Sequence, residues 1–168
     1  MIITVGELTG KEQPAIEMTI RIQAAFDEIV PLENKLSIAY LIWKDPYMAA
    51  GGGTFIDDML NRCGFKNIYK NNARYPEVTS TFSSNKPKIS SDSLSTLCDS
   101  YPPPLSDCRL LLLSSEPYPF KAVHLQQLQS QLPGCRIMLV EGEMFSWYGS
   151  RLLLAAEYFK KLIRQIQG

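Results

Sequence analysis

The segment CRLLLLSS, residues 108–115, constrains the fold of this chain more than any other feature of its sequence. Four consecutive leucines leave no alternation of apolar and polar residues, a pattern typical of a β-strand that is buried on both faces. Two further segments predict strands: KLSIAYLIW at residues 35–43, which is rich in apolar residues, and CRIMLVEG at residues 135–142, which is expected to be buried. The short segment KNIY predicts one more strand, and strands of this type require a sheet that helices cover on both sides.

Segments with helical spacing of apolar residues alternate with these strands. A long helix is expected over residues 9–30, with Thr9 or Gly10 as its cap, Glu12 placed as in a capping box, and Pro31 after its end. Further helices are expected over residues 54–63, which Gly64 ends, and over residues 120–132 and 148–167.

This order of elements predicts an α/β fold, a three-layer lobe with a parallel sheet, preceded by a long backbone helix. We assign residues 1–34 to the backbone helix region and residues 35–168 to the lobe. Residues 80–107 are rich in Ser and Pro and are expected to be a loop insertion with a short helix near residues 92–97. Because ligands of such sheets bind at the carboxyl ends of strands, the segments to search are residues 44–53, 114–120 and 141–150.

Three consecutive glycines, Gly51, Gly52 and Gly53, lie in the first of these segments. A Walker phosphate loop requires a lysine that is missing here, and Ile56 stands where the third glycine of a dinucleotide-binding fingerprint belongs. We therefore expect a tight strand-to-helix turn with close approach of the backbone. A nucleotide-binding protein or enzyme that uses this turn is the alternative.

Aromatic side chains gather in the segments that follow the strands, together with one carboxylate, Glu143, and one arginine, Arg151. Aromatic faces with a few polar groups suit a flat ligand that has polar edges. The residues concerned are Trp43, Tyr47, Met48, Tyr75, Tyr118, Phe120, Glu143, Phe145, Trp147, Tyr148 and Arg151.

Features of catalytic and metal sites are not found in the sequence, which contains neither paired carboxylates nor a nucleophile elbow. The single histidine, His124, is expected at the surface. The cysteines are too far apart for a zinc site and are expected to be buried free thiols: Cys63, Cys98, Cys108 and Cys135. We expect a binding protein with no metal site and no cofactor, not an enzyme.

Charge and hydropathy exclude two further classes of protein. Lys and Arg together number 17, as do Asp and Glu, so the basic excess of a nucleic-acid binder is missing. The sequence contains no apolar run of roughly 18 residues, so it does not predict a membrane-spanning helix. The first residues, MIITVGELTGKEQP, lack the features of a signal peptide, so the chain is expected to be either cytoplasmic or a processed product.

Five motifs in a fixed order carry a resemblance to a known family: ELTGKEQPA, IWKDPYMAAGGGTFIDDMLNRCGFKNIY, RYPEVT, LLLLSSEPYPF and EGEMFSWYGSR. They resemble the C-terminal part of the helical-backbone substrate-binding proteins of bacterial ABC importers, the type that binds cobalamin or iron siderophores. In that family two α/β lobes are joined by one long helix, and the ligand lies between the lobes. The resemblance implies that this chain contains the helix and the C-terminal lobe, with the N-terminal lobe absent.

The same resemblance implies the function of a substrate-binding component for a cobalamin-like, haem-like or siderophore-metal ligand. The partner would be the importer's permease and the location the periplasm or the extracellular surface. The family docks on its permease through a surface glutamate in each lobe; the nearest position here is Thr81, and Glu77 is the candidate substitute. Self-association through the face left by the missing lobe is a third possibility.

The resemblance also implies the residues that would contact the ligand. Tyr47 or Met48 and Tyr75 match positions that pack on the ligand, and Trp147 would add a further stacking surface. Glu143 and Arg151 match an acid and an arginine in the last loop, where the arginine would pair with a carboxylate or phosphate of the ligand.

Overall fold

The computed structural model of the chain describes residues 1–79 and 102–168 as a mixed α/β fold. Its strands are β1 (Ser37–Trp43), β2 (Met48–Ala49), β3 (Lys66–Asn67), β4 (Leu110–Ser114) and β5 (Arg136–Val140). Its α-helices are α1 (Ile2–Thr9), α2 (Glu12–Asp27), α3 (Phe55–Arg62), α5 (Ala122–Gln131), α6 (Gly142–Ser146) and α7 (Arg151–Gln167), with one short 3-10 helix at Leu105–Asp107. Among the described helices, none is long and apolar enough to cross a membrane.

The sheet is built around the four leucines of β4. Strand order is β2-β1-β4-β5, with β3 also paired to β1, and β4 lies parallel to both of its neighbours. Leu110, Leu111, Leu112 and Leu113 are all fully buried, as the unbroken apolar run predicts. The α/β class and the mainly parallel sheet are thereby confirmed, although β2 runs antiparallel to β1.

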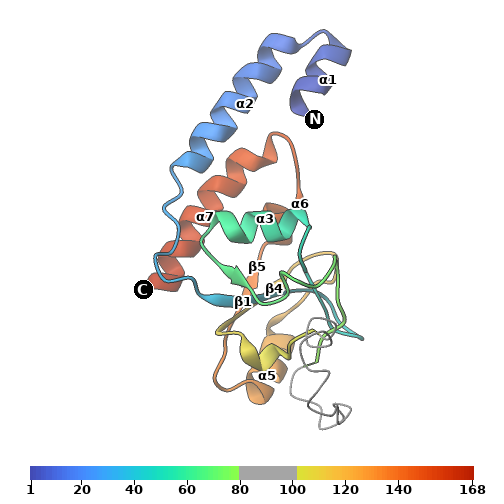
Figure 1. Ribbon diagram of the computed structural model, residues 1–168, viewed down its shortest axis with the longest axis vertical. Helices are drawn as coiled ribbons and strands as arrows, with labels where there is room; N and C mark the ends of the chain where they lie inside the picture. Colours follow the sequence, from blue (N-terminus) through green and yellow to red (C-terminus); the bar gives the residue numbers. More distant parts are fainter. Residues whose placement is uncertain (80–101) are drawn as a thin grey trace, which may run out of the picture.

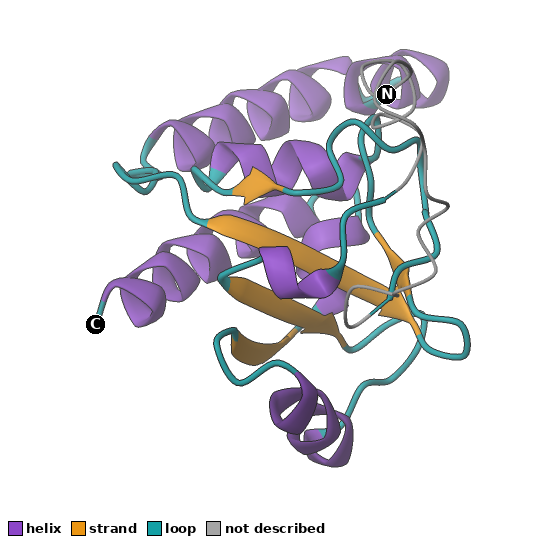
Figure 2. Cartoon of the chain, turned by 60° about the horizontal axis from the view of Figure 1, so that its bottom comes forward, coloured by secondary structure: helices purple, strands orange, loops and turns teal. Residues whose placement is uncertain are grey.

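Helices cover both faces of the sheet (Figure 2). On one face Tyr40 and Leu112 pack with α3, α6 and α7, and aromatic rings continue this core through Phe145 to Phe159. On the other face Leu41 and Leu111 join a second core that includes α5. Because side chains alternate across a strand, β1 and β4 contribute to both cores.

The expected helix over residues 9–30 is wrong in its bounds. Gly10 adopts a left-handed conformation with φ +64° and ends α1, so α2 begins only at Glu12 and ends at Asp27. The predicted capping box is also wrong, because α2 has no capping hydrogen bond from a side chain. Glycine tolerates positive φ, and this is the reason that the chain turns back here (Figure 1).

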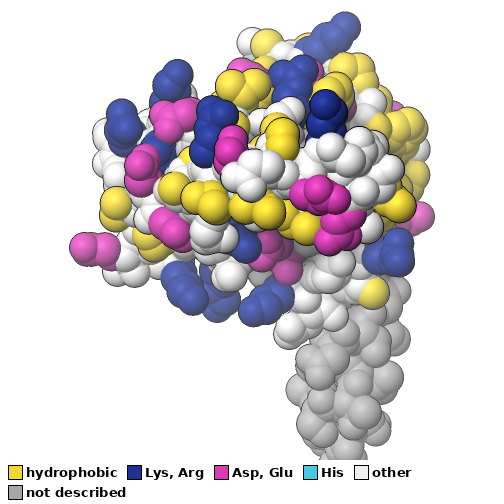
Figure 3. Space-filling model, turned by 90° about the horizontal axis from the view of Figure 1, so that it is seen from above, with side chains coloured by type: hydrophobic (Ala, Val, Ile, Leu, Met, Phe, Trp, Pro, Cys, Tyr) yellow, Lys and Arg dark blue, Asp and Glu magenta, His cyan; other side chains and the backbone are white. Residues whose placement is uncertain are grey.

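The two N-terminal helices pack on each other and reach the lobe through α7. Gly6 of α1 lies against Ala15 of α2, and Phe26, near the end of α2, meets the ring of Phe159 edge to face. Several apolar side chains stay exposed at this end of the molecule, between charged residues (Figure 3). They include Val5, Leu8, Ile16 and Ile20.

Two smaller expectations also need correction. The segment of β5 is not buried on both faces, since Leu139 is 42% exposed and β5 pairs only with β4 in the described part of the sheet. His124 is partly buried, because its ring packs against Tyr118 and Phe120. The expected helix near residues 92–97, Cys98 and Thr81 lie outside the described residues, as does most of the expected insertion at residues 80–107.

Candidate ligand-binding site

The glycine turn is closed by the chain's own backbone. The N–H of Gly51 donates to the carbonyl oxygen of Arg74 at 2.6 Å, and the N–H of Gly52 donates to that of Asn72 at 2.8 Å. A Cβ on Gly52 would overlap the carbonyl oxygen of Lys70, and Gly53 has φ +70°. The expected tight turn with close backbone approach is therefore confirmed, and two of its amide donors are already used.

Buried Asn67 fixes this turn to the neighbouring loop. Its side-chain amide donates to the carbonyl oxygen of Ala50 at 3.0 Å and to the carboxylate of Asp57 at 2.8 Å, while its own oxygen accepts from the N–H of Tyr69 at 3.0 Å. Thr54 caps α3 by accepting from the N–H of Asp57. Each of these polar groups serves the fold.

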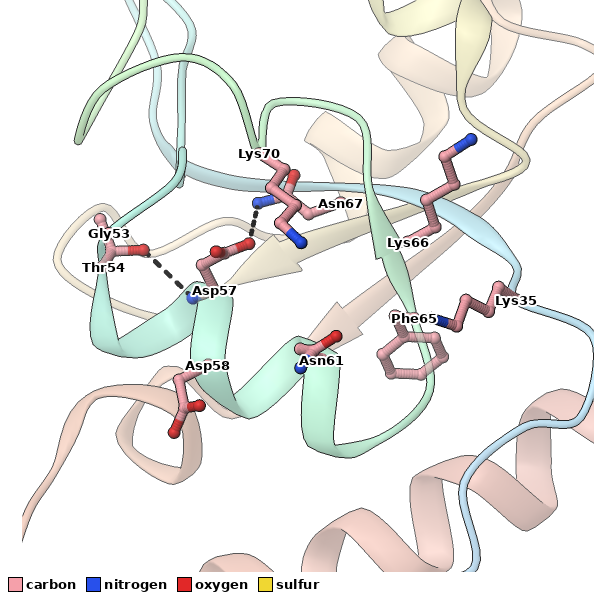
Figure 4. A pocket seen from close by; sticks show the side chains of 10 residues that line it. All are labelled: Lys35, Gly53, Thr54, Asp57, Asp58, Asn61, Phe65, Lys66, Asn67 and Lys70. Carbon is pink, nitrogen blue, oxygen red and sulfur yellow. Dashed lines mark hydrogen bonds between the residues drawn. The ribbon is translucent and has the colours of Figure 1, made fainter.

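A hollow of about 250 Å³ lies beside α3 and the glycine turn (Figure 4). Its lining residues are Lys35, Gly53, Thr54, Asp57, Asp58, Asn61, Phe65, Lys66, Asn67 and Lys70. Asp57 and Asp58 place two carboxylates in the first turn of α3, which is the position where a phosphate would have to bind. Together with the occupied glycine amides, these charges disfavour a nucleotide site at the turn.

A larger cavity of about 440 Å³ lies at the carboxyl ends of β1 and β4. Its lining residues are Tyr40, Ile42, Ile56, Tyr75, Glu116, Pro117, Gly142 and Ser146. Tyr40 and Ile42 stand two positions apart on β1 and so share one face of the sheet, with Ile56 of α3 opposite. The cavity is mainly apolar and lies at the end of the sheet where α/β folds bind ligands.

Glu116 is the only charged residue among those that line this cavity. Its Oε1 accepts a hydrogen bond from the Ser146 hydroxyl at 2.7 Å and another from Trp147 Nε1 at 2.9 Å. These bonds join the segment after β4 to the segment after β5 and hold the carboxylate in one orientation. Sequence reasoning selected the segment 114–120 but not Glu116, which is the first charged residue after the leucine strand.

Behind the carboxylate, a buried chain of hydroxyl groups supports the same loop. Tyr40 Oη donates to Ser114 Oγ at 3.0 Å, and Ser114 Oγ donates to the backbone oxygen of Glu116. Burial raises the pKa of the Tyr40 phenol, so this side chain stays neutral. Gly142 packs directly on Ser114 and on the Glu116 side chain, which leaves no room for a Cβ.

Four of the six residues predicted for the site lie in or beside this arrangement. Tyr75 lines the cavity, and Trp147 is bonded to Glu116. The Arg151 guanidinium stacks on the Trp147 ring, 5.0 Å from its centroid, and its Nη2 is 3.7 Å from Glu143 Oε2. Tyr75 and Trp147 remain 45% and 43% exposed, so both rings are available to a ligand.

The other two predicted residues, Tyr47 and Met48, are not among those that line the cavity. Tyr47 packs against the core on the α5 side of the sheet, where partial burial and the Asp45 carboxylate raise the pKa of its phenol. Met48 belongs to β2 and packs against the opposite core. The structure does not bring these two together with Trp147 and Arg151.

No family model and no curated protein matches this sequence. Solved structures do match its fold. The periplasmic haem-binding protein HutB of Vibrio cholerae has a TM-score of 0.67 at 14% identity, over 95% of this chain and 60% of that protein. A possible iron-binding, periplasmic solute-binding protein of Staphylococcus epidermidis has a TM-score of 0.64 at 16% identity, over 99% and 60% of the two chains.

An ABC transporter substrate-binding protein of Listeria monocytogenes has a TM-score of 0.64 at 12% identity, over 96% of this chain and 61% of that protein. The chain thus spans about 60% of the length of each of these proteins. The described elements therefore have the fold found in the substrate-binding proteins of ABC importers.

Proposed function

We propose that this chain is the C-terminal part of an ABC-importer substrate-binding protein that binds a flat metal chelate, a haem-like, cobalamin-like or siderophore-metal ligand. The observation that carries the proposal is the cavity at the carboxyl ends of β1 and β4, with exposed aromatic rings around it. The matched proteins are named as binders of haem or iron, and this supports the ligand class. In this role the chain has no catalytic activity, its partner is the importer's permease, and its location is the periplasm or the cell surface.

Aromatic stacking would supply most of the contact area. Tyr75 at the cavity and Trp147 beside it present faces to which a planar ligand can pack. The cavity's 440 Å³ falls within the range of small-molecule sites. A second lobe would provide the other wall of the cleft.

Charged groups would set the orientation of the ligand. Glu116 offers a carboxylate at the cavity wall, which suits a hydrogen-bond donor or a cationic group. Arg151 is held at 3.7 Å from Glu143, a distance too long for a strong bidentate pair, so its N–H donors remain able to bind a ligand carboxylate or phosphate. We expect a ligand with a donor edge toward Glu116 and an anionic group toward Arg151.

Titration of the purified chain with haem, cyanocobalamin and a ferric hydroxamate siderophore tests this proposal. Binding is followed by tryptophan fluorescence and by the absorbance of each chelate. One of the three is expected to bind saturably, and Arg151→Ala is expected to weaken this binding by about tenfold or more, the effect of losing one charge-assisted pair. Arg164→Ala, an exposed arginine near the other end of α7, is the matched control.

Equal affinity of Arg151→Ala and Arg164→Ala would contradict the assigned site. Absence of binding by all three chelates, in this chain and in a two-lobed protein that contains it, would contradict the function. Stabilisation by ATP or NAD in a thermal-shift assay, with no effect of any chelate, would favour the nucleotide alternative instead.

A further inference from the structure

Two thiols lie in contact at the amino end of the sheet, the end away from the proposed ligand site. Cys108 Sγ and Cys135 Sγ are 3.4 Å apart, although the residues are 27 positions apart in the chain. Cys108 directly follows the short helix Leu105–Asp107 and lies just before β4, and Cys135 immediately precedes β5.

The backbone around both cysteines is held by the sheet. Arg136 donates its N–H to the carbonyl oxygen of Arg109 at 2.9 Å, and Leu110 pairs with Arg136 in the parallel register. A disulfide has an S–S distance of about 2.05 Å, so the sulfurs would approach by roughly 1.4 Å. Because the pairing of β4 with β5 fixes the strand register, the proposed bond requires that rotation of the two side chains supply this movement.

The pair borders the surface of the protein, although Cys108 is only 2% and Cys135 only 4% exposed. A surface hollow of about 330 Å³ is lined by both cysteines together with Asp107, Leu132 and Gly134 among others. Cys63 is 0% exposed, lies in the core on the other face of the sheet, and is not among the residues that line this hollow. Burial raises the pKa of the Cys63 thiol to about 12, which keeps it unreactive.

We propose that Cys108 and Cys135 are a site of reversible oxidation, at which a small-molecule disulfide such as glutathione disulfide converts the two thiols into an intramolecular disulfide. The thiolate of one cysteine attacks a sulfur of the reagent and releases one glutathione. The sulfur of the other cysteine then displaces the second glutathione from this mixed disulfide. The two cysteines lose two electrons and two protons, and these reduce the reagent to two thiols.

The contact between the two sulfurs assigns the first step to Cys135. The hydrogen bond between the two sulfurs lowers the pKa of the Cys135 thiol and raises that of Cys108. A thiolate is the attacking species in thiol–disulfide exchange, so Cys135 reacts first and Cys108 resolves the mixed disulfide.

The new bond would close a loop that contains β4 and α5. Closing a loop of this length stabilises a protein mainly through its unfolded state and should raise the melting temperature by on the order of 5–10 °C. Because the bond forms at the amino end of the sheet, it leaves the cavity at the carboxyl end unchanged. The proposal is therefore independent of the proposed function.

The test is incubation of the purified chain with glutathione disulfide, followed by intact mass measurement and tryptic peptide mapping without reductant. The tryptic peptide that ends at Arg109 also carries Cys98, so the mapping is done in a Cys98→Ser background as well as in the unsubstituted chain. We expect a loss of two hydrogens, a link between the peptides of Cys108 and Cys135, and the stated rise in melting temperature. Dithiothreitol should reverse all three.

Matched variants separate this outcome from others. Cys63→Ser should keep the link, and Cys108→Ser should replace it with a stable glutathione adduct on Cys135. An adduct on Cys135 without an internal link in the Cys98→Ser chain would overturn the proposal. A link from Cys135 to Cys98 in the unsubstituted chain, or the persistence of all free thiols, would also overturn it.

Discussion

Two loops that follow strands of this sheet, the glycine turn after β2 and the Glu116 loop after β4, differ in how their polar groups are used. In the glycine turn, amide and carbonyl groups bond to the chain itself, through Gly51, Gly52 and Asn67. Around Glu116, the polar network instead borders a cavity, and the rings of Tyr75 and Trp147 are exposed to solvent. The comparison teaches that position at a strand end does not by itself make a ligand site. A loop whose hydrogen-bond donors are all paired within the chain supports the fold. A loop that has exposed side chains beside a cavity can bind a ligand.

The largest expected effect is on the scaffold side, for Gly52→Ala. The added Cβ would overlap the backbone oxygen of Lys70, which cannot move away as a flexible side chain could. We expect a loss of about 3 kcal/mol in the free energy of unfolding, measured by urea denaturation. Gly134→Ala is the control, because its Cβ would meet open space, and it should change stability by less than about 0.5 kcal/mol. Equal stability of the two variants would mean that the glycine turn is not tightly packed.

A smaller loss is expected for Asn67→Ala, which removes three hydrogen bonds and leaves the carbonyl of Ala50 and the N–H of Tyr69 without this partner. An unsatisfied buried polar group is costly, so we expect the free energy of unfolding to fall by about 2 kcal/mol. Exposed Asn61 of α3 provides the matched control, and Asn61→Ala should stay within about 0.5 kcal/mol. If both substitutions had the same small effect, Asn67 would not fix the turn.

At the candidate ligand site, a substitution should change ligand affinity with little effect on the free energy of unfolding. Trp147→Phe keeps an aromatic ring but loses the hydrogen bond to Glu116. Because Trp147 is partly exposed, the free energy of unfolding should change by less than about 1 kcal/mol. Under the proposed function, ligand affinity should nevertheless fall, because Glu116 loses one of its two orienting donors. Tyr148→Phe removes the hydroxyl of the neighbouring ring and serves as the control in the same titrations. A loss in the free energy of unfolding as large as that of Asn67→Ala would mean that Trp147 serves mainly to stabilise the fold.

The elements of the lobe could be predicted because their signals are local. The four leucines of β4, the capping Thr54 and the helix-ending Gly64 act within a few residues of the structure that they specify. The break at Gly10 was missed because a glycine inside an apolar pattern does not show whether it adopts positive φ. The exposure of β5 depends on its position at the end of the strand order, and the local sequence of a strand does not specify its position in the sheet.

The candidate site was predictable in its location but only partly in its residues. Tyr75, Trp147 and Arg151 follow from the gathering of aromatic and charged residues after strands. Glu116 depends on Ser146 and Trp147, which lie about 30 positions further along the chain, and no local pattern reports such a contact. Tyr47 was selected by its position after β1, yet its ring is directed to the core on the α5 side.

The left-handed turn at Gly10 has a consequence for the dynamics of the N-terminal region. Since α1 packs mainly on α2, and α2 reaches the lobe mainly through α7, α1 and the start of α2 can open without disturbing the sheet. Amide hydrogens should therefore exchange with deuterium in a gradient along α2, fastest near Glu12 and slowest near Phe26, where the ring of Phe159 supports the helix. The hairpin would then act as a separately opening unit, with a free energy of opening well below that of the strands.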